Sequence, residues 1–398
     1  MSELIKHKQN SDSQCVQTSC PYCGVGCGVD ITVEQGKAVK LSGTPEHPAN
    51  FGRLCVKGTN LLATNHPKGR LLHPVVRGEQ TSWEQAIEAL AKGFSDIIAE
   101  HGPDAVAFYG SGQLLTEDYY VANKLMKGYI GSANIDTNSR LCMSSAVSGY
   151  KRAFGEDLVP CSYQDLENTD LILLIGSNAA WTHPVLFQRM EKAKSINPDL
   201  QIFAIDPRRT ASAELADCHL PITPGSDAAL FNGLLNFLAE NQGLDQAYID
   251  SFTNNFTACL EQSRQWSVSR TAKHCGISEA LLTRLYQAFV DNKRVISFYC
   301  MGINQSSSGT DKCNAIINCH LASGKIGQPG SGPFSITGQP NAMGGREVGG
   351  LSSLLAAHMD IGNPKHRDLV QTFWQSPTIA TSPGYTATEL FDKIAQGK

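Results

Sequence analysis

Residues 171–184 read LILLIGSNAAWTHP, an uninterrupted apolar run that leads into a loop of glycine and small polar residues. Five apolar residues in a row are typical of a strand buried on both faces of a parallel sheet, and the run is too short to span a bilayer. The same order of strand, loop and helical pattern recurs at 104–113 (DAVAFYGSGQ), 201–209 (QIFAIDPRR) and 295–305 (VISFYCMGINQ). This alternation predicts an α/β fold with a largely parallel sheet.

The loops after these strands are the expected ligand-binding region, because open parallel sheets bind ligands at the carboxyl ends of their strands. No loop carries GxGxxG, so a nicotinamide site is not supported. An acidic residue in this position can still hydrogen-bond to a nucleotide, and a helix start favours anions. For any single loop, turn formation with a helix cap is the simpler interpretation. The residues concerned are Gln113, Asn178, Asp206, Gln305 and the pair Ser226 and Asp227.

Three cysteines lie close together in TSCPYCGVGCGVD (18–30), at Cys20, Cys23 and Cys27, and Cys55 follows after 27 intervening residues. A tight triplet with one remote cysteine favours an iron–sulfur cluster over a zinc ribbon, which usually has two CxxC pairs. A structural zinc knuckle is the alternative. Lys57 stands two residues after Cys55, where its charge would lie between the cluster and a second redox cofactor if one is bound.

Further segments have clear local signals. Residues 28–40 alternate apolar and polar side chains around EQG and therefore predict a hairpin. Residues 81–102 have a capping Thr or Ser and helical apolar spacing, which predicts a helix.

The stretch 324–350 holds nine glycines, so it is either disordered or lies with its backbone against a large ligand. Arg346 within it is a permanent cation that can meet an oxyanion; a surface arginine is the alternative.

Composition excludes several classes of function. The 398 residues have average apolar content and a net charge of −4, which predicts two or three globular domains and no nucleic-acid partner. Thirteen cysteines is an odd number, and most thiols stay free in a reducing compartment, so a disulfide scaffold is not expected. The first residues, MSELIKHKQNSDSQ, lack an apolar leader and a twin arginine. The chain is therefore expected in the cytoplasm, without a membrane partner.

At TNSRLCMSSAVSGYKRAFG (137–155) the chain resembles the molybdopterin oxidoreductases related to dimethyl sulfoxide reductase, and among them the cytoplasmic assimilatory nitrate reductases. The resemblance implies a 4Fe-4S cluster, molybdenum and two molybdopterin guanine dinucleotides. It implies a small iron–sulfur domain at 13–70, an α/β domain of 71–140 with 325–398, and a Rossmann-like dinucleotide-binding domain at 141–324. Members of the family continue further, so their C-terminal part is expected to be missing here.

The resemblance also assigns residues. Cys142 is the implied molybdenum ligand, a soft thiolate suited to a metal bound by dithiolenes, whereas composition alone indicates only a buried thiol. Met143 and Arg346 are the other catalytic candidates, and Cys20, Cys23, Cys27 and Cys55 are the cluster ligands. The implied cofactor contacts are Lys57, Gln113, Asn138, Gly176, Ser177, Asn178, Trp181, Thr182, Asp206, Gly225, Ser226, Asp227, Met301 and Gln305.

The implied reaction is reduction of nitrate to nitrite by oxygen-atom transfer. Similar formate dehydrogenases have histidine after the cysteine or selenocysteine, whereas Met143 follows Cys142, which favours nitrate. Arg346 would then guide the anion. The expected electron donor is a ferredoxin, a flavodoxin or an NADH-linked reductase subunit. The alternatives are a formate dehydrogenase of the same family and a non-catalytic iron–sulfur electron carrier on the same fold.

Overall fold

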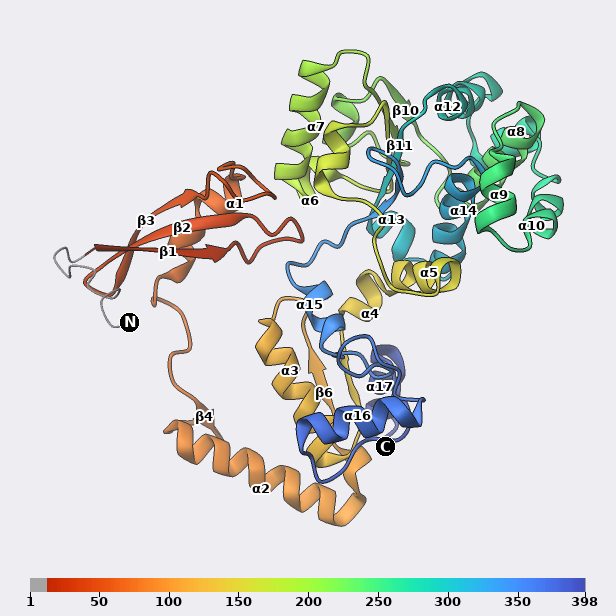
Figure 1. Ribbon diagram of the computed structural model, residues 1–398. Coiled ribbons are helices and arrows are strands. Elements are labelled where there is room, and N and C mark those ends of the chain that lie inside the picture. Colours follow the sequence, from red (N-terminus) through yellow and green to blue (C-terminus); the bar gives the residue numbers. More distant parts are fainter. Residues whose placement is uncertain (1–12, 398) are drawn as a thin grey trace, which may run out of the picture.

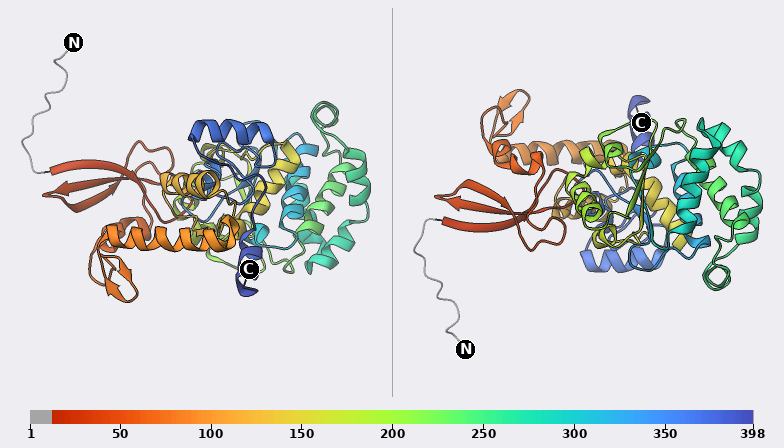
Figure 2. Two further views of the ribbon diagram at one scale, coloured as in Figure 1. Left: turned by 90° about the horizontal axis from the view of Figure 1, so that it is seen from below. Right: turned by 90° about the horizontal axis from the view of Figure 1, so that it is seen from above.

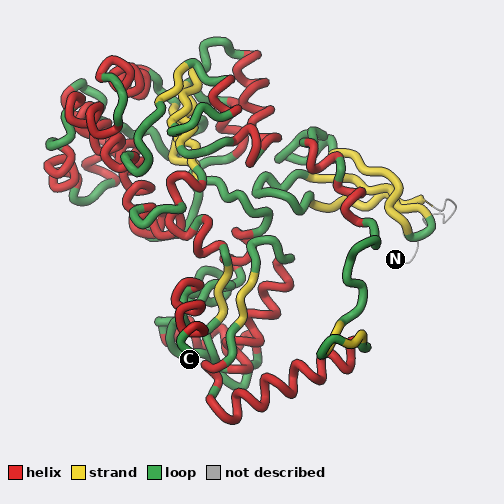
Figure 3. Tube along the Cα trace, turned by 180° about the vertical axis from the view of Figure 1, so that it is seen from behind, coloured by secondary structure: helices red, strands yellow, loops and turns green. Residues whose placement is uncertain are grey.

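The computed structural model describes residues 13–397 (Figure 1). Residues 1–12, on which most of the expectation about a leader rests, lie outside the described residues. Three parts are visible: a small antiparallel sheet at the N-terminus, a larger parallel sheet flanked by helices, and a third part made of α2, α3, α16, α17 and a short strand pair. The tube in Figure 3 shows the strands gathered in these separate places.

The N-terminal sheet has the antiparallel order β1 (Ser13–Ser19), β2 (Gly28–Glu34) and β3 (Lys37–Gly43). The expected hairpin is confirmed: Gln35 and Gly36 both have positive φ, 50° and 74°, as the tight turn between β2 and β3 requires. The sheet projects to one side of the molecule in both views of Figure 2. Helix α1 (Val56–Thr59) and a 3-10 turn (Leu61–Asn65) follow.

The central sheet has five parallel strands in the order β10 (Cys218–Leu220), β9 (Gln201–Ile205), β8 (Leu171–Ile175), β11 (Val295–Tyr299) and β12 (Gly332–Ser335). Both faces of β8 are buried, because Leu171, Leu173 and Ile175 belong to one core cluster and Ile172 and Leu174 to another. The predicted parallel sheet and its buried strands are thus confirmed.

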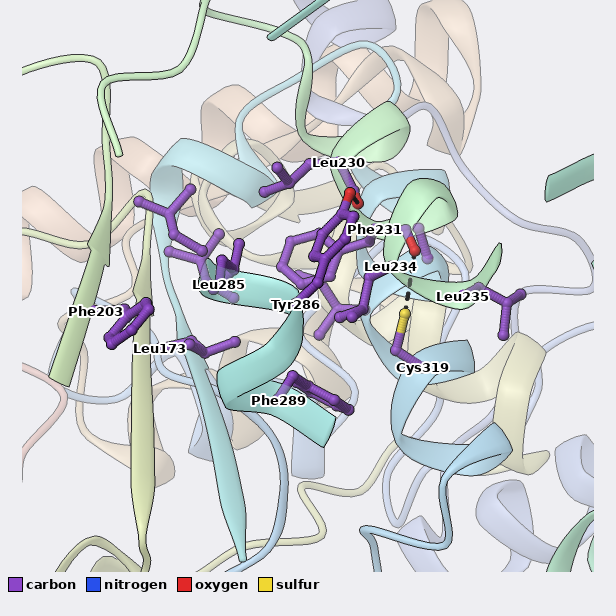
Figure 4. Packing of buried hydrophobic residues seen from close by; sticks show 14 of the residues in the cluster. Leu173, Phe203, Leu230, Phe231, Leu234, Leu235, Leu285, Tyr286, Phe289 and Cys319 are labelled. Carbon is purple, nitrogen blue, oxygen red and sulfur yellow. Dashed lines mark hydrogen bonds between the residues drawn. The ribbon is translucent and has the colours of Figure 1, made fainter. Parts of the chain in front are cut away.

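Helices pack on both faces of this sheet. Figure 4 shows the larger core, where Leu173 and Phe203 meet Leu230 and Phe231 of α8 (Asp227–Glu240) and Tyr286 of α12 (Glu279–Asp291). The other face is covered mainly by α7 (Pro184–Ile196). The remaining helices on the first side are α5 (Ser144–Phe154), α9 (Gln246–Phe252), α10 (Phe256–Ser263), α11 (Val268–Cys275) and α14 (Gly309–Ala322).

The third part is built on a separate two-stranded parallel sheet of β6 (Phe108–Gly110) and β7 (Ile135–Thr137). The predicted helix at 81–102 is α2 (Trp83–His101), begun by a capping box between Ser82 and Gln85 and ended before Gly102. The other elements are the hairpin β4 (Val75–Val76) and β5 (Glu79–Gln80), α3 (Thr116–Lys124), a π-helix (Leu125–Ile130), α16 (Pro364–Trp374) and α17 (Ala387–Ala395).

Two expectations change. Gln113 follows β6 and therefore does not lie on the edge of the central sheet, because β6 pairs only with β7 among the described strands. The expected boundary at residue 325 separates β12 from the sheet in which it pairs with β11. The rest of the domain division stays a prediction.

None of the helices within residues 13–397 has the length and apolar character needed to cross a bilayer.

The glycine-dense stretch is ordered by long-range contacts. It contains β12 and α15 (Ala342–Glu347), and its final glycines are held by Lys127 of the π-helix. The buried Lys127 ammonium donates to the carbonyls of Gly349, Leu351 and Leu354 at 2.8, 2.8 and 2.5 Å. Disorder of this stretch is therefore ruled out.

Candidate cofactor-binding site

The four motif cysteines converge beside the N-terminal sheet. Cys20, Cys23 and Cys27 are buried on the loop between β1 and β2, which the Cys20 amide closes by donating to the Cys27 carbonyl at 2.8 Å. Cys55 precedes α1 and is half-buried. Burial first, and then the neighbouring thiols Cys23, Cys20 and Cys55, raise the pKa of Cys27 to about 12. Each thiol therefore lies within electrostatic range of the others.

This donor set fits a cluster of several irons better than a single ion. Within residues 13–397, no group of three or more His, Cys, Asp or Glu side chains is spaced to hold one metal ion. A cube takes one thiolate for each iron, so its ligands are farther apart than those around zinc. Because thiolates bind and neutral thiols do not, a cationic cluster would offset the cost of burying their charge. The tight triplet of Cys20, Cys23 and Cys27 with the remote Cys55 keeps iron–sulfur as the expectation ahead of zinc.

The charge of Lys57 acts both on this loop and on His183, at the end of the first predicted cofactor loop. Burial is the largest effect on Cys20 and Cys23 and raises the pKa of both thiols. The charge of Lys57 opposes this shift by lowering both pKa values. The same charge lowers the pKa of His183, which immediately follows Thr182 in the first predicted cofactor loop. The role of Lys57 as a cation between two redox centres stays a prediction.

The carboxyl ends of the five parallel strands form a common edge. Gly176, Asp206 and Met301 lie just beyond the ends of β8, β9 and β11, and the register pairs Ile175 with both Ile205 and Tyr299. Gly176, at φ 53°, accepts a hydrogen bond at its carbonyl from Gly302 at 3.0 Å. A Cβ at Gly302 would lie 2.6 Å from the Gly176 Cα, so this crossing of two loops requires glycine.

Several buried polar atoms at this edge have no partner. They are Ser177 Oγ after β8, Asn304 Nδ2 in α13 (Met301–Asn304) and Gln339 Oε1 in the loop after β12. Unpaired buried polar groups are costly, so a native structure rarely leaves three in one region without a ligand. Adjacent loops that carry such atoms fit a large polar cofactor lying along this edge.

The other predicted contacts have mixed surroundings. Asn178 begins α6 (Ala179–Thr182) and accepts from Ser212 Oγ at 2.9 Å, while Trp181 is 69% exposed and free to meet a planar ligand. Asp227 is paired with Lys312 at 2.7 Å, both nearly buried, so its carboxylate already has a partner that the sequence did not indicate. Gly225 and Gln305 are exposed, and Ser226, which follows Gly225, is buried.

Cys142 lies where the parts of the chain meet. It ends α4 (Ser139–Cys142), which follows β7, and it packs in one apolar cluster with Met143, Val147 of α5, Ala342 of α15 and Met301. Figure 1 shows α4, α13 and α15 together at the junction between the central sheet and the third part. The structure therefore brings Met301 together with the consecutive residues Cys142 and Met143, although it lies far from them in the sequence.

The segments that carry Gln113 and Asn138 belong to the third part and contact the glycine-dense stretch near this junction. Asn138 Oδ1 accepts from the Gly112 amide at 2.9 Å, and the Gly112 carbonyl accepts from the Asn341 amide at 3.0 Å. Gln113 itself is exposed. The loop after β6 thus reaches the glycine-dense stretch through Gly112, although Gln113 is not on the central sheet.

Arg346 is buried in α15, so the surface alternative is wrong. Its Nη1 lies 3.1 Å from Asp157 Oδ1, and both side chains are nearly inaccessible. Burial lowers the pKa of Arg346, while Asp157 opposes that shift. Arg346 Nε and Asp157 Oδ2 are buried without partners, so the arginine retains at least its Nε donor. No sequence pattern indicated Asp157 as the partner, because it lies 189 positions from Arg346.

These features define an iron–sulfur α/β protein with a second, larger ligand site at a sheet edge. The chain belongs to the molybdopterin oxidoreductase family: residues 13–66 match the model of its Fe4S4 domain and residues 70–398 match the molybdopterin oxidoreductase model. The cofactors of this family are a 4Fe-4S cluster and molybdenum with molybdopterin.

Several proteins that the chain resembles are named nitrate reductases. The chain is 56% identical to a nitrate reductase of Klebsiella oxytoca and 51% identical to one of Shewanella frigidimarina, in each case over 96% of this chain. It is 39% identical to a periplasmic nitrate reductase of Desulfovibrio desulfuricans over 98% of its length. It spans only 43, 42 and 54% of these relatives.

A solved structure shows the same fold. Acetylene hydratase from Pelobacter acetylenicus aligns with 77% of this chain and 43% of its own length, with a TM-score of 0.68 and 22% identity. At this identity the likeness establishes the fold alone, and the predicted α/β class with an iron–sulfur domain and parallel sheet is confirmed.

Proposed function

We propose that this chain provides the cluster-binding and molybdenum-binding parts of a nitrate reductase that converts nitrate to nitrite. The observation that carries the proposal is its 56% identity, over 96% of the chain, to a protein named nitrate reductase. Met143 supports the choice of nitrate over formate, because it occupies the position where similar formate dehydrogenases have histidine.

When bound, molybdenum with its pterins would supply the chemistry that removes one oxygen atom from nitrate. The reaction consumes two electrons and two protons and yields nitrite and water. Cys142 is the residue proposed to hold the metal, because its soft thiolate suits this centre and its helix α4 lies at the junction of the parts. Cys20, Cys23, Cys27 and Cys55 are proposed to hold the cluster.

Lys57 is proposed to lie on the path of electrons between the cluster loop and the sheet edge. Its ammonium influences Cys20 and Cys23 on one side and His183 on the other. A fixed cation there stabilises an added electron on either side by attraction. The loops that begin at Gly176 and Met301 are proposed to hold the pterin.

Arg346 is proposed to orient nitrate near Cys142. Its helix α15 packs on Cys142 through Ala342, and its Nε has no protein partner. Asp157 balances part of its charge, so the guanidinium can be buried without a fully uncompensated cation. One remaining donor is sufficient to orient a nitrate oxygen by a charge-assisted hydrogen bond.

The biological setting proposed is nitrate assimilation in the cytoplasm, with electrons from a ferredoxin, a flavodoxin or an NADH-linked subunit. The chain is less similar to the relative named as periplasmic (39% identity) than to two relatives whose names carry no such label (56 and 51%), which supports this choice. Cell fractionation and growth on nitrate as sole nitrogen source test it; a periplasmic protein, or growth that does not depend on the gene, would contradict it.

The central test is metal analysis of anaerobically purified protein together with dye-linked assays. We expect about four irons and about one molybdenum per chain, and nitrate reduction driven by reduced viologen. Cys142→Ser should keep the iron and lose nitrate reduction. Cys319→Ser, at a buried thiol in α14 that donates to the Phe231 carbonyl in the core, is the matched control and should retain both.

Each contrary outcome selects an alternative. Formate oxidation without nitrate reduction would identify a formate dehydrogenase. Iron without molybdenum would identify an electron carrier. Undiminished nitrate reduction by Cys142→Ser would refute the role of this thiolate.

A further inference from the structure

His183 connects the first predicted cofactor loop to a distant backbone carbonyl. It follows α6, precedes Pro184 at the start of α7 and is completely buried. Its Nε2 lies 2.7 Å from the carbonyl oxygen of Thr337, 154 positions away, and its Nδ1 lies 2.9 Å from Thr182 Oγ1. The ring also packs edge-on against Phe298 of β11, with centroids 6.2 Å apart.

The two hydrogen bonds settle which ring nitrogen carries the proton. A carbonyl oxygen can only accept, so Nε2 must donate to Thr337. Burial, the largest effect, and the charge of Lys57 lower the pKa of His183 to about 4, so the ring is neutral and Nδ1 is an acceptor. The single hydrogen of the Thr182 hydroxyl is shared between Nδ1 at 2.9 Å and the Asn178 carbonyl at 3.1 Å. The ring is therefore held at both ends in one tautomer and one orientation.

The carbonyl that His183 holds also contacts the cluster loop. A Cβ at Gly24, between Cys23 and Cys27, would lie 2.2 Å from the Thr337 oxygen, so the two backbones touch where only glycine fits. The Gly24 amide donates to the next carbonyl, that of Gly338, at 3.2 Å. His183 thus holds one side of a backbone segment whose other side supports the loop with three cluster ligands.

We propose that His183 is a positioning residue that fixes the cluster loop relative to the cofactor loop, by clamping Thr337 between Gly24 and Thr182. The inference rests on the proposed ligand roles of the cysteines and of the loop ending at Thr182. Amide donors and glycine contacts around cluster sulfurs tune the reduction potential. Displacement of Thr337 and Gly338 therefore alters the surroundings of the cluster without removal of any ligand.

The test compares three variants of the holoprotein purified without oxygen. His183→Asn shortens the side chain so that it no longer reaches Thr337, while His183→Gln can place an amide nitrogen near the position of Nε2. His320→Gln is the matched control, because His320 is equally buried and hydrogen-bonded at both nitrogens but packs against Phe289 in the other core cluster. The readouts are the midpoint potential of the cluster, its EPR spectrum when reduced, and amide exchange.

We expect His183→Asn to shift the potential and the EPR line shape and to speed exchange of the Gly24 amide by about tenfold, as expected for loss of about one hydrogen bond. His183→Gln should restore all three toward wild type, and His320→Gln should change none. Gly24→Ala, which presses on Thr337 from the opposite side, should also shift the potential.

Wild-type potential and exchange in His183→Asn would overturn the proposal, as would an equal shift in His320→Gln. If His183→Asn does not fold, a shifted potential in His183→Gln together with an unshifted one in Gly24→Ala would overturn it, and the reverse pattern would support it. None of these readouts uses nitrate. Failure of the wild-type nitrate assay would therefore refute the proposed function separately.

Discussion

Lys127→Met removes the ammonium that organises the end of the glycine-dense stretch while it keeps the aliphatic stem. The wild-type Nζ donates to three backbone carbonyls, those of Gly349, Leu351 and Leu354, and is completely buried. Each buried carbonyl left without a donor costs about 1–3 kcal/mol. The variant also avoids the cost of burying the ammonium, which offsets part of this loss. We expect a net loss of about 3–5 kcal/mol in the free energy of unfolding.

The measurement is urea unfolding at pH 6, because burial lowers the pKa of Lys127 to about 7 and the wild-type side chain must be an ammonium. Amide exchange across 348–356 should accelerate in the variant, since Lys127 supplies the donors that order this segment. The control is Lys124→Met, one turn earlier on a partly exposed side chain, which should change stability by less than about 0.5 kcal/mol. A loss below about 1 kcal/mol with unchanged exchange would refute the reasoning.

Three further predictions concern other buried charged or titratable groups. Arg189→Met removes donors to the Pro48 and Ala49 carbonyls and should loosen the iron–sulfur domain, seen as faster bleaching of the cluster by air; bleaching at the wild-type rate would contradict this. Burial lowers the pKa of His320 to about 4, below its unfolded value of about 6.5, so the unfolded state binds more protons between these values. Stability should therefore fall by roughly 3 kcal/mol as the pH drops from 6.5 to 4, and His320→Gln should lack this part of the slope in pH-dependent urea unfolding. Arg346→Gln combined with Asp157→Asn removes both charges of a buried pair and should raise the KM for nitrate by about tenfold or more, the value of one charge-assisted hydrogen bond; an unchanged KM would exclude Arg346 from nitrate binding.

Local signals in the sequence determined much of the fold. The apolar run at 171–175 is buried on both faces because no polar residue interrupts it, and α2 begins at Ser82 because a side-chain cap satisfies its first amides. The spacing of Cys20, Cys23 and Cys27 likewise predicted a clustered site, since a short loop keeps its own residues close together.

Tertiary structure decided what depends on pairing between distant segments. Strand β6 has the same local pattern as β8 but pairs with β7 in a separate sheet, which removes Gln113 from the central edge. The sequence left open whether Arg346 meets an oxyanion or lies on the surface, and only the fold buries it against Asp157. The partner of His183 is the backbone carbonyl of Thr337, an acceptor that every residue carries, so no side-chain pattern can predict it. The sequence alone therefore determined the elements and the cluster motif, whereas long-range packing decided which backbone groups and charges meet.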